Sequence, residues 1–100
     1  MESEAFEILE KSFSEEWRNE ACGLALDQIG KFIEKHKLRN TNFLKRANSA
    51  LYILALGLAK KDLVFKPEEA EKYLNEQLVR IRDGGFDVVE DLFHEVMSVK

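Results

Sequence analysis

Apolar residues recur in the first third of the chain at the spacing of one face of a helix. They stand three or four residues apart as far as Trp17 and four apart beyond it: Phe6, Leu9, Phe13, Trp17, Ala21, Ala25, Ile29 and Ile33. Such spacing is typical of an amphipathic helix. A helical turn takes about 3.6 residues, so each step of four rotates the apolar face by about 40°. The pattern predicts a helix over residues 4–36 whose two halves face different neighbours.

The same segment contains a signal for the start of a helix. Ser12-Phe13-Ser14-Glu15 matches a capping box, in which a serine and a carboxylate three residues later satisfy free backbone N–H groups. This motif leaves open a break near Ser12. The apolar positions keep their phase across it, however, so we favour one long or gently kinked helix.

A second helix is predicted over residues 42–61. Asn40 or Thr41 is suited to cap its first turn, because a short polar side chain can accept a hydrogen bond from a free backbone N–H group. Lys60-Lys61 suits its end, where the helix dipole is negative. The second half of this helix carries apolar residues on every side.

Two shorter helices are predicted in the last third of the chain. Pro67 precedes two glutamates and opens a helix over 67–83, because proline is tolerated at the first helical position and acids stabilise the first turn. Gly84-Gly85 is a strong signal for the end of that helix. Asp87 is suited to cap a last helix over 87–99.

These elements indicate an all-α fold. No stretch alternates between apolar and polar residues in the manner of a strand. The chain has 100 residues, which is close to the common size of one domain. Short connections favour antiparallel neighbours. We therefore predict a single domain over residues 1–100, folded as an antiparallel up-and-down four-helix bundle with a long first helix.

Two stretches, 21–26 and 50–59, are apolar around the whole helix and rich in small residues. Either the remaining helices cover them, or part of this surface is the interface of a homodimer, as expected for large exposed apolar patches. The two alternatives stay open at the level of sequence. The candidate interface residues are Leu26, Tyr52, Ile53 and Leu56.

Composition limits the class of protein. Hydrophobic residues make up 45% of the chain and charged residues 34%, with one proline and five glycines, which excludes a disordered chain. Cys22 is the only cysteine, so no disulfide forms within the chain. The acidic N-terminus does not resemble a secretory signal, and the apolar run 50–59 is about half of the ~20 residues that span a membrane. We therefore expect a soluble protein of the reducing cytoplasm.

The net charge of −4 is the sum over a chain that contains two acidic segments and one basic segment. Residues 1–20 contain seven acids and two bases, a balance of −5, and residues 83–95 contain five acids and no lysine or arginine. Residues 31–46 contain six bases and one acid, a balance of +5. This basic segment is the candidate contact for nucleic acid or for an acidic partner, through Lys31, Lys35, Lys37, Arg39, Lys45 and Arg46.

We find no constellation that indicates catalysis. The chain lacks a phosphate-binding loop and the cysteine and histidine pairs of common metal sites. His94 follows Asp91 by three residues, but no second unit of this kind completes a di-metal site. We expect no catalytic residue, no metal and no cofactor.

The sequence favours a small non-catalytic module for protein–protein interaction, such as a regulator, an adaptor or a subunit of a complex, and we expect it to form a homodimer and to bind a further protein partner. The main alternative is a regulator that binds nucleic acid through the basic segment 31–46. A third hypothesis is a small-molecule sensor with a pocket between Trp17, Tyr52 and Tyr73. The charge blocks and the surplus of apolar helix surface favour the first of these.

Overall fold

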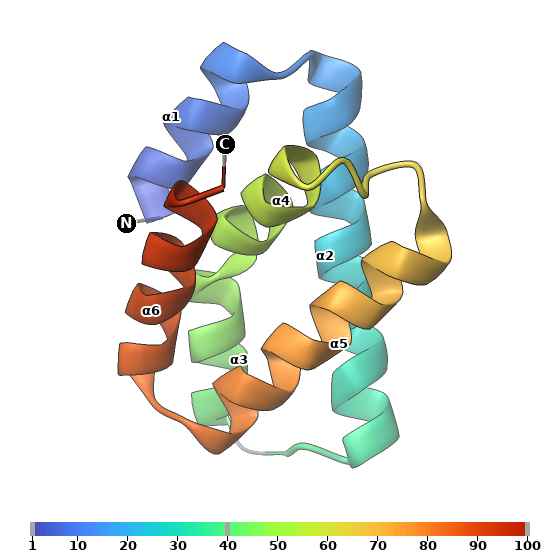
Figure 1. Ribbon diagram of the computed structural model, residues 1–100. Helices are drawn as coiled ribbons and strands as arrows, with labels where there is room; N and C mark the ends of the chain where they lie inside the picture. The colour runs from blue at the N-terminus through green and yellow to red at the C-terminus, as the bar shows by residue number, and fades with distance from the viewer. Residues whose placement is uncertain (1, 40, 100) are drawn as a thin grey trace.

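The computed structural model describes residues 2–39 and 41–99, which form six helices and no strand (Figure 1). In chain order the helices are α1 (Glu2–Ser12), α2 (Glu15–His36), α3 (Thr41–Ser49), α4 (Leu51–Lys60), α5 (Pro67–Asp83) and α6 (Phe86–Met97). The predicted all-α class is confirmed. The predicted four-helix bundle is not found, because two of the four expected helices are each divided into two.

The first division separates α1 from α2, so the prediction of one helix over 4–36 is wrong. The chain turns at residues 13–14, and α2 runs back in the opposite general direction (Figure 1). Its reversal lays α1 against α4, where Ala5 and Leu9 are buried. The spacing of apolar residues can stay regular across a turn between two helices. The spacing alone therefore did not reveal the break between α1 and α2.

Local hydrogen bonds stabilise this turn. Ser14, rather than Ser12, caps α2: its side chain accepts a hydrogen bond from the backbone N–H of Trp17 at 3.3 Å. Arg18 donates from Nη1 to the carbonyls of Glu10, at 3.2 Å, and of Phe13, at 3.1 Å. These carbonyls lie at the end of α1, where the helix itself offers no partner.

The second division separates α3 from α4 at Ala50. The backbone N–H of Ala50 donates to the carbonyls of Arg46 and Ala47, both at 3.1 Å, so hydrogen bonding continues while the axis changes direction (Figure 1). Asn48 and Ser49 precede the bend, and residues with short polar side chains favour the ends of helices over their interiors.

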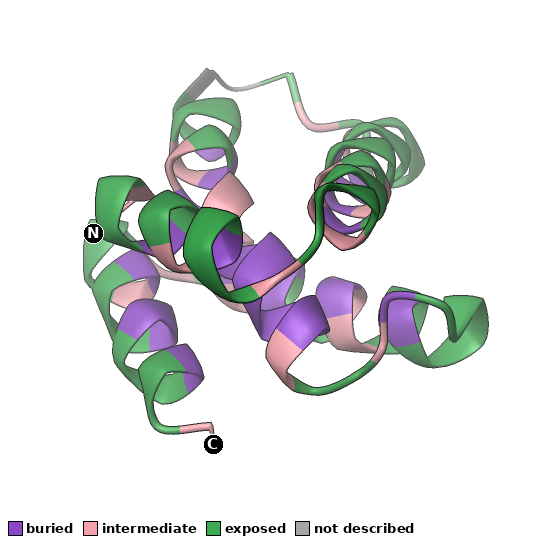
Figure 2. Ribbon diagram, turned by 90° about the horizontal axis from the view of Figure 1, so that it is seen from above, coloured by how far each residue is buried: buried purple, intermediate pink, exposed green. Residues whose placement is uncertain are grey.

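Helix α4 is the centre of the fold. It contacts all five other helices, and Figure 2 shows the buried residues gathered in the middle of the molecule. Seven consecutive residues are buried: Ile53, Leu54, Ala55, Leu56, Gly57, Leu58 and Ala59. The other helices of the same chain therefore cover the apolar stretch 50–59. Ile53 and Leu56, two of the four candidate interface residues, belong to the core instead.

The other apolar stretch, 21–26, is amphipathic in the folded chain. Ala21 and Ala25 are buried on the side of α2 that faces the core, whereas Leu26 keeps 54% of its surface exposed. A partly buried side-chain pair also joins α2 to α5, since the Gln28 amide donates to Oδ1 of Asn75 at 2.8 Å. The apolar stretch 21–26 is therefore covered on one side only.

The last two helices lie close to where the sequence predicts them. Helix α5 begins at Pro67 and ends at Asp83, as expected. Helix α6 begins at Phe86, so Gly85 is its N-cap and Asp87 lies within the first turn, where its charge still suits the dipole.

Candidate protein-interaction surfaces

A groove lies between α1 and the start of α4, with a volume of about 410 Å³. Two aromatic rings meet in it edge to face: the centroids of Phe6 and Tyr52 are 4.9 Å apart and the ring planes are inclined by 62°. Phe6 keeps 38% of its surface exposed, so this contact does not bury it. The remaining lining residues are polar or acidic: Glu2, Ser3, Glu7 and Glu10.

The sequence of α1 explains why acids and an aromatic ring share the groove. Glu2, Phe6 and Glu10 follow one another at intervals of four residues, which places them along one side of a helix. Ala5 and Leu9, one position earlier, turn toward the core. The groove therefore combines an apolar floor with negative charge and has no basic residue in its lining.

The basic segment 31–46 lies at the opposite end of the molecule from the α1–α2 turn, around the connection between α2 and α3 (Figure 1). Two of its six basic residues bind within the chain. Lys31 pairs with Asp27 at 3.0 Å. Arg46 donates from Nε to the carbonyl of Ile81 at 3.0 Å and from Nη2 to that of Arg82 at 3.4 Å, and so ties α3 to the end of α5.

The other four basic residues, Lys35, Lys37, Arg39 and Lys45, are exposed. Lys37 caps α2 in the left-handed conformation, with φ 53°, and its N–H bonds the carbonyls of Ile33 and Glu34. This backbone conformation turns the chain toward α3. We refer to these four residues, which lie at the end of α2, just after it and in α3, as the basic end.

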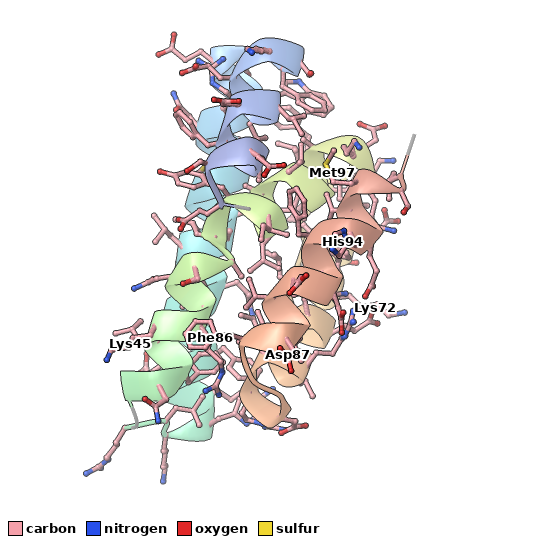
Figure 3. All side chains as sticks on the ribbon, turned by 90° about the vertical axis from the view of Figure 1, so that its left-hand side faces the viewer. Lys45, Lys72, Phe86, Asp87, His94 and Met97 are labelled. Carbon is pink, nitrogen blue, oxygen red and sulfur yellow. The ribbon has the colours of Figure 1, made fainter. Side chains whose placement is uncertain are left out.

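An exposed aromatic ring from far along the chain adjoins the basic end. Phe86, in the first turn of α6, keeps 59% of its surface exposed, and α6 contacts α3, the helix that carries Lys45 (Figure 3). The two phenylalanines within the basic segment itself, Phe32 and Phe43, are instead buried and stack on each other with centroids 5.4 Å apart. The sequence pattern did not associate Phe86 with the basic end, because Phe86 and Lys45 are separated by forty-one positions (86 − 45).

The three aromatic residues of the hypothetical sensor pocket fall in three different places. Trp17 contacts Phe13 and Phe65, and Tyr52 contacts Phe6. Tyr73 packs against Gly57 of α4 and lines a separate hollow of about 180 Å³. The pocket predicted between Trp17, Tyr52 and Tyr73 is therefore not formed.

A metal site and a reactive thiol each place requirements on the titratable side chains. Within residues 2–39 and 41–99, no three histidine, cysteine or acidic side chains are grouped as a metal site requires. His94 approaches Glu90 at 3.7 Å, and both side chains are well exposed. Burial raises the pKa of the half-buried Cys22 thiol, which disfavours the reactive thiolate. Burial likewise raises the pKa of Tyr73 to about 12, with Glu95 adding to the shift.

Among the helices of the described residues, none is both long enough and apolar enough to span a membrane. No protein-family model, curated protein sequence or solved structure matches the chain. The groove and the basic end are therefore interpreted from their own chemistry.

Proposed function

We propose that this chain is a non-catalytic protein-interaction module of the cytoplasm that binds a basic, amphipathic segment in the α1–α4 groove. The observation that carries the proposal is the groove itself. It places the partly exposed rings of Phe6 and Tyr52 between the side chains of Glu2, Glu7 and Glu10. Aromatic residues supply most of the affinity at such surfaces, and complementary charge selects and orients the partner.

A basic amphipathic helix fits this arrangement. Its leucine side chains would enter the groove against Phe6 and Tyr52, and its lysine or arginine side chains would meet the three glutamates. Helices that dock in grooves present apolar anchors at intervals of three and four residues. An acidic partner is disfavoured, because three glutamates already line the groove.

Fluorescence polarisation with a labelled probe tests this function. The probe is a fifteen-residue amphipathic peptide of leucine and lysine, and its control has glutamate at every lysine position. We expect the basic peptide to bind, and to bind more weakly as the salt concentration rises. The control peptide should not bind.

Two matched variants locate the binding site. Phe6→Ala should weaken binding at least tenfold, because it removes an anchor worth more than about 1.4 kcal/mol. Phe65→Ala removes another exposed ring, which contacts Trp17 far from the groove, and should leave the affinity unchanged. Equal effects of the two substitutions, or binding of the acidic peptide, would contradict the proposal.

Binding of single-stranded nucleic acid at the basic end is the second candidate, favoured by the exposed ring of Phe86 on α6, which contacts the helix that carries Lys45. Exposed rings stack on bases, and neighbouring cations contact phosphates. Filter binding of a single-stranded oligonucleotide at two salt concentrations tests it. Phosphate contacts predict an affinity that falls steeply with salt, and no binding even at low salt would exclude this function.

A further inference from the structure

We infer that the basic partner of the groove is a second copy of this chain. In this arrangement the basic end of one copy docks in the α1–α4 groove of the other, and the reverse contact forms at the same time. The inference rests on the proposed function of the groove and adds the identity of its occupant.

Charge complementarity is the first argument. The groove offers Glu2, Glu7 and Glu10. The basic end offers four exposed cations: Lys35, Lys37, Arg39 and Lys45. Each surface therefore supplies what the other requires, although the chain as a whole carries a net charge of −4. Two copies that meet through like surfaces would instead repel each other.

The two surfaces do not satisfy each other within one molecule. Helix α1 and the α2–α3 connection lie in different halves of the fold (Figure 1), whose longest dimension is 35 Å. At physiological ionic strength, charges are screened beyond about 8 Å. Pairing between the groove and the basic end thus requires a second molecule.

The placement of α1 and α3 allows both contacts to form together. On the face shown in Figure 3, α1 lies above α3. A two-fold axis that lies in the plane of the interface, at right angles to the line from α1 to α3, would set α1 of each copy opposite α3 of the other. Such an interface contains every contact twice and closes after two copies, which is the commonest symmetry of homo-oligomers. The assembly would be a dimer rather than a filament.

Apolar residues on both sides add affinity to the charge pairing. Leu44 precedes Lys45 on α3 and keeps 42% of its surface exposed. Phe86 adjoins the same end, and Phe6 is exposed in the groove. In the dimer, Leu44 of one copy would contact the rings of Phe6 and Tyr52 of the other copy. Lys45 would pair with the glutamates of the same groove.

Sedimentation of the whole chain tests for the dimer. We expect a monomer–dimer equilibrium that depends on protein concentration and a dissociation constant that rises at least tenfold between 50 and 500 mM NaCl. A monomer at every concentration up to the millimolar range would overturn the inference. Species that grow beyond the dimer would overturn the two-fold arrangement.

A charge exchange gives the sharper test. One variant carries Glu7→Lys and Glu10→Lys, and the other carries Arg39→Glu and Lys45→Glu; all four side chains are exposed. Each variant alone should be monomeric, because groove and basic end then have like charge. An equimolar mixture should restore the dimer, because both contacts become complementary again. A mixture that stays monomeric overturns the inference.

Controls separate this inference from the proposed function. Glu20→Lys with Glu71→Lys changes the net charge of the chain as much as the groove variant does, at exposed positions outside both surfaces, and should leave the dimer intact. Circular dichroism of each variant verifies the fold. A monomeric wild type that still binds the basic peptide refutes self-association alone, whereas a chain that binds neither refutes both.

Discussion

Arg80 binds Glu95 through two parallel hydrogen bonds that join α5 to α6. Nη1 donates to Oε1 at 2.9 Å and Nη2 donates to Oε2 at 2.6 Å. Nη1 also donates to Oε1 of the buried Gln77 at 2.9 Å. The hydrogen bonds from Arg80 lower the pKa of the Glu95 carboxyl below its ordinary value of 4.5. Both side chains are more than one third exposed, so solvent screens the pair.

This pair predicts a dependence of stability on pH. A carboxyl whose pKa is lowered by folding stabilises the folded state above its unfolded pKa, and this contribution disappears as the pH falls through the lowered value. Glu95→Gln should therefore cost about 0.5–1 kcal/mol at pH 7. Urea unfolding should show the difference from the wild type shrinking below pH 4.5. The exposed Glu20→Gln is the control, and an equal pH dependence in both variants would contradict the assignment.

Gly57 and Tyr73 predict a pair of coupled substitutions. A Cβ atom at Gly57 would overlap the Tyr73 hydroxyl of α5. Gly57→Ala should destabilise the fold by about 1–3 kcal/mol, although alanine in a helix interior is ordinarily favoured over glycine by about 1 kcal/mol. Removing the hydroxyl with Tyr73→Phe should recover part of the loss. A double-mutant cycle in urea measures this coupling, and additive effects would show that the two residues do not meet.

Leu56 and Leu26 predict opposite responses to an introduced charge. Leu56 is fully buried in α4, so Leu56→Lys places an unpaired charge in the core and should unfold the chain. Leu26→Lys changes a side chain that is mostly exposed. The far-ultraviolet circular dichroism spectrum of this variant should therefore equal that of the wild type. If Leu56→Lys gave a soluble, folded monomer, Leu56 would be an interface residue and not a core residue.

Alanine substitutions at Ser14 and at Ser12 distinguish which of the two serines caps α2. Ser14→Ala removes the acceptor of the Trp17 N–H and should cost about 1 kcal/mol of the free energy of unfolding. Ser12→Ala tests the cap that the capping-box motif suggests, and it should change this free energy by less than about 0.5 kcal/mol. Thermal unfolding followed by circular dichroism ranks the two. The reverse order would move the start of α2 back to Ser12.

The sequence predicted well those boundaries that depend on local chemistry. Pro67 fixes its own backbone φ and Gly84 is free of the restriction that a Cβ imposes, and α5 begins and ends where these two residues indicate. The serine motif left open the break after Ser12, and no signal predicted the one at Ala50; the direction that the chain takes at each depends on which helices pack together. Apolar periodicity reports which side of a helix is buried but carries no information on the direction in which the chain continues.

The candidate surfaces were predicted in part for the same reason. Lys35, Lys37, Arg39 and Lys45 are close in sequence, and their shared location followed from that. Phe6 was assigned to a core stripe, and its meeting with Tyr52 requires the chain reversal that the pattern did not reveal. Arg46 was grouped with the exposed cations, whereas the carbonyls of α5 bind it.

The central position of α4 has a consequence for how the chain is made. A ribosome releases α4 before α5 and α6, so a newly synthesised chain that ends near residue 60 carries its most apolar helix without two of the helices that cover it. Such exposed segments attract chaperones and other unfolded chains. Folding of this core therefore requires α5 and α6, and truncation after α4 should leave an insoluble fragment.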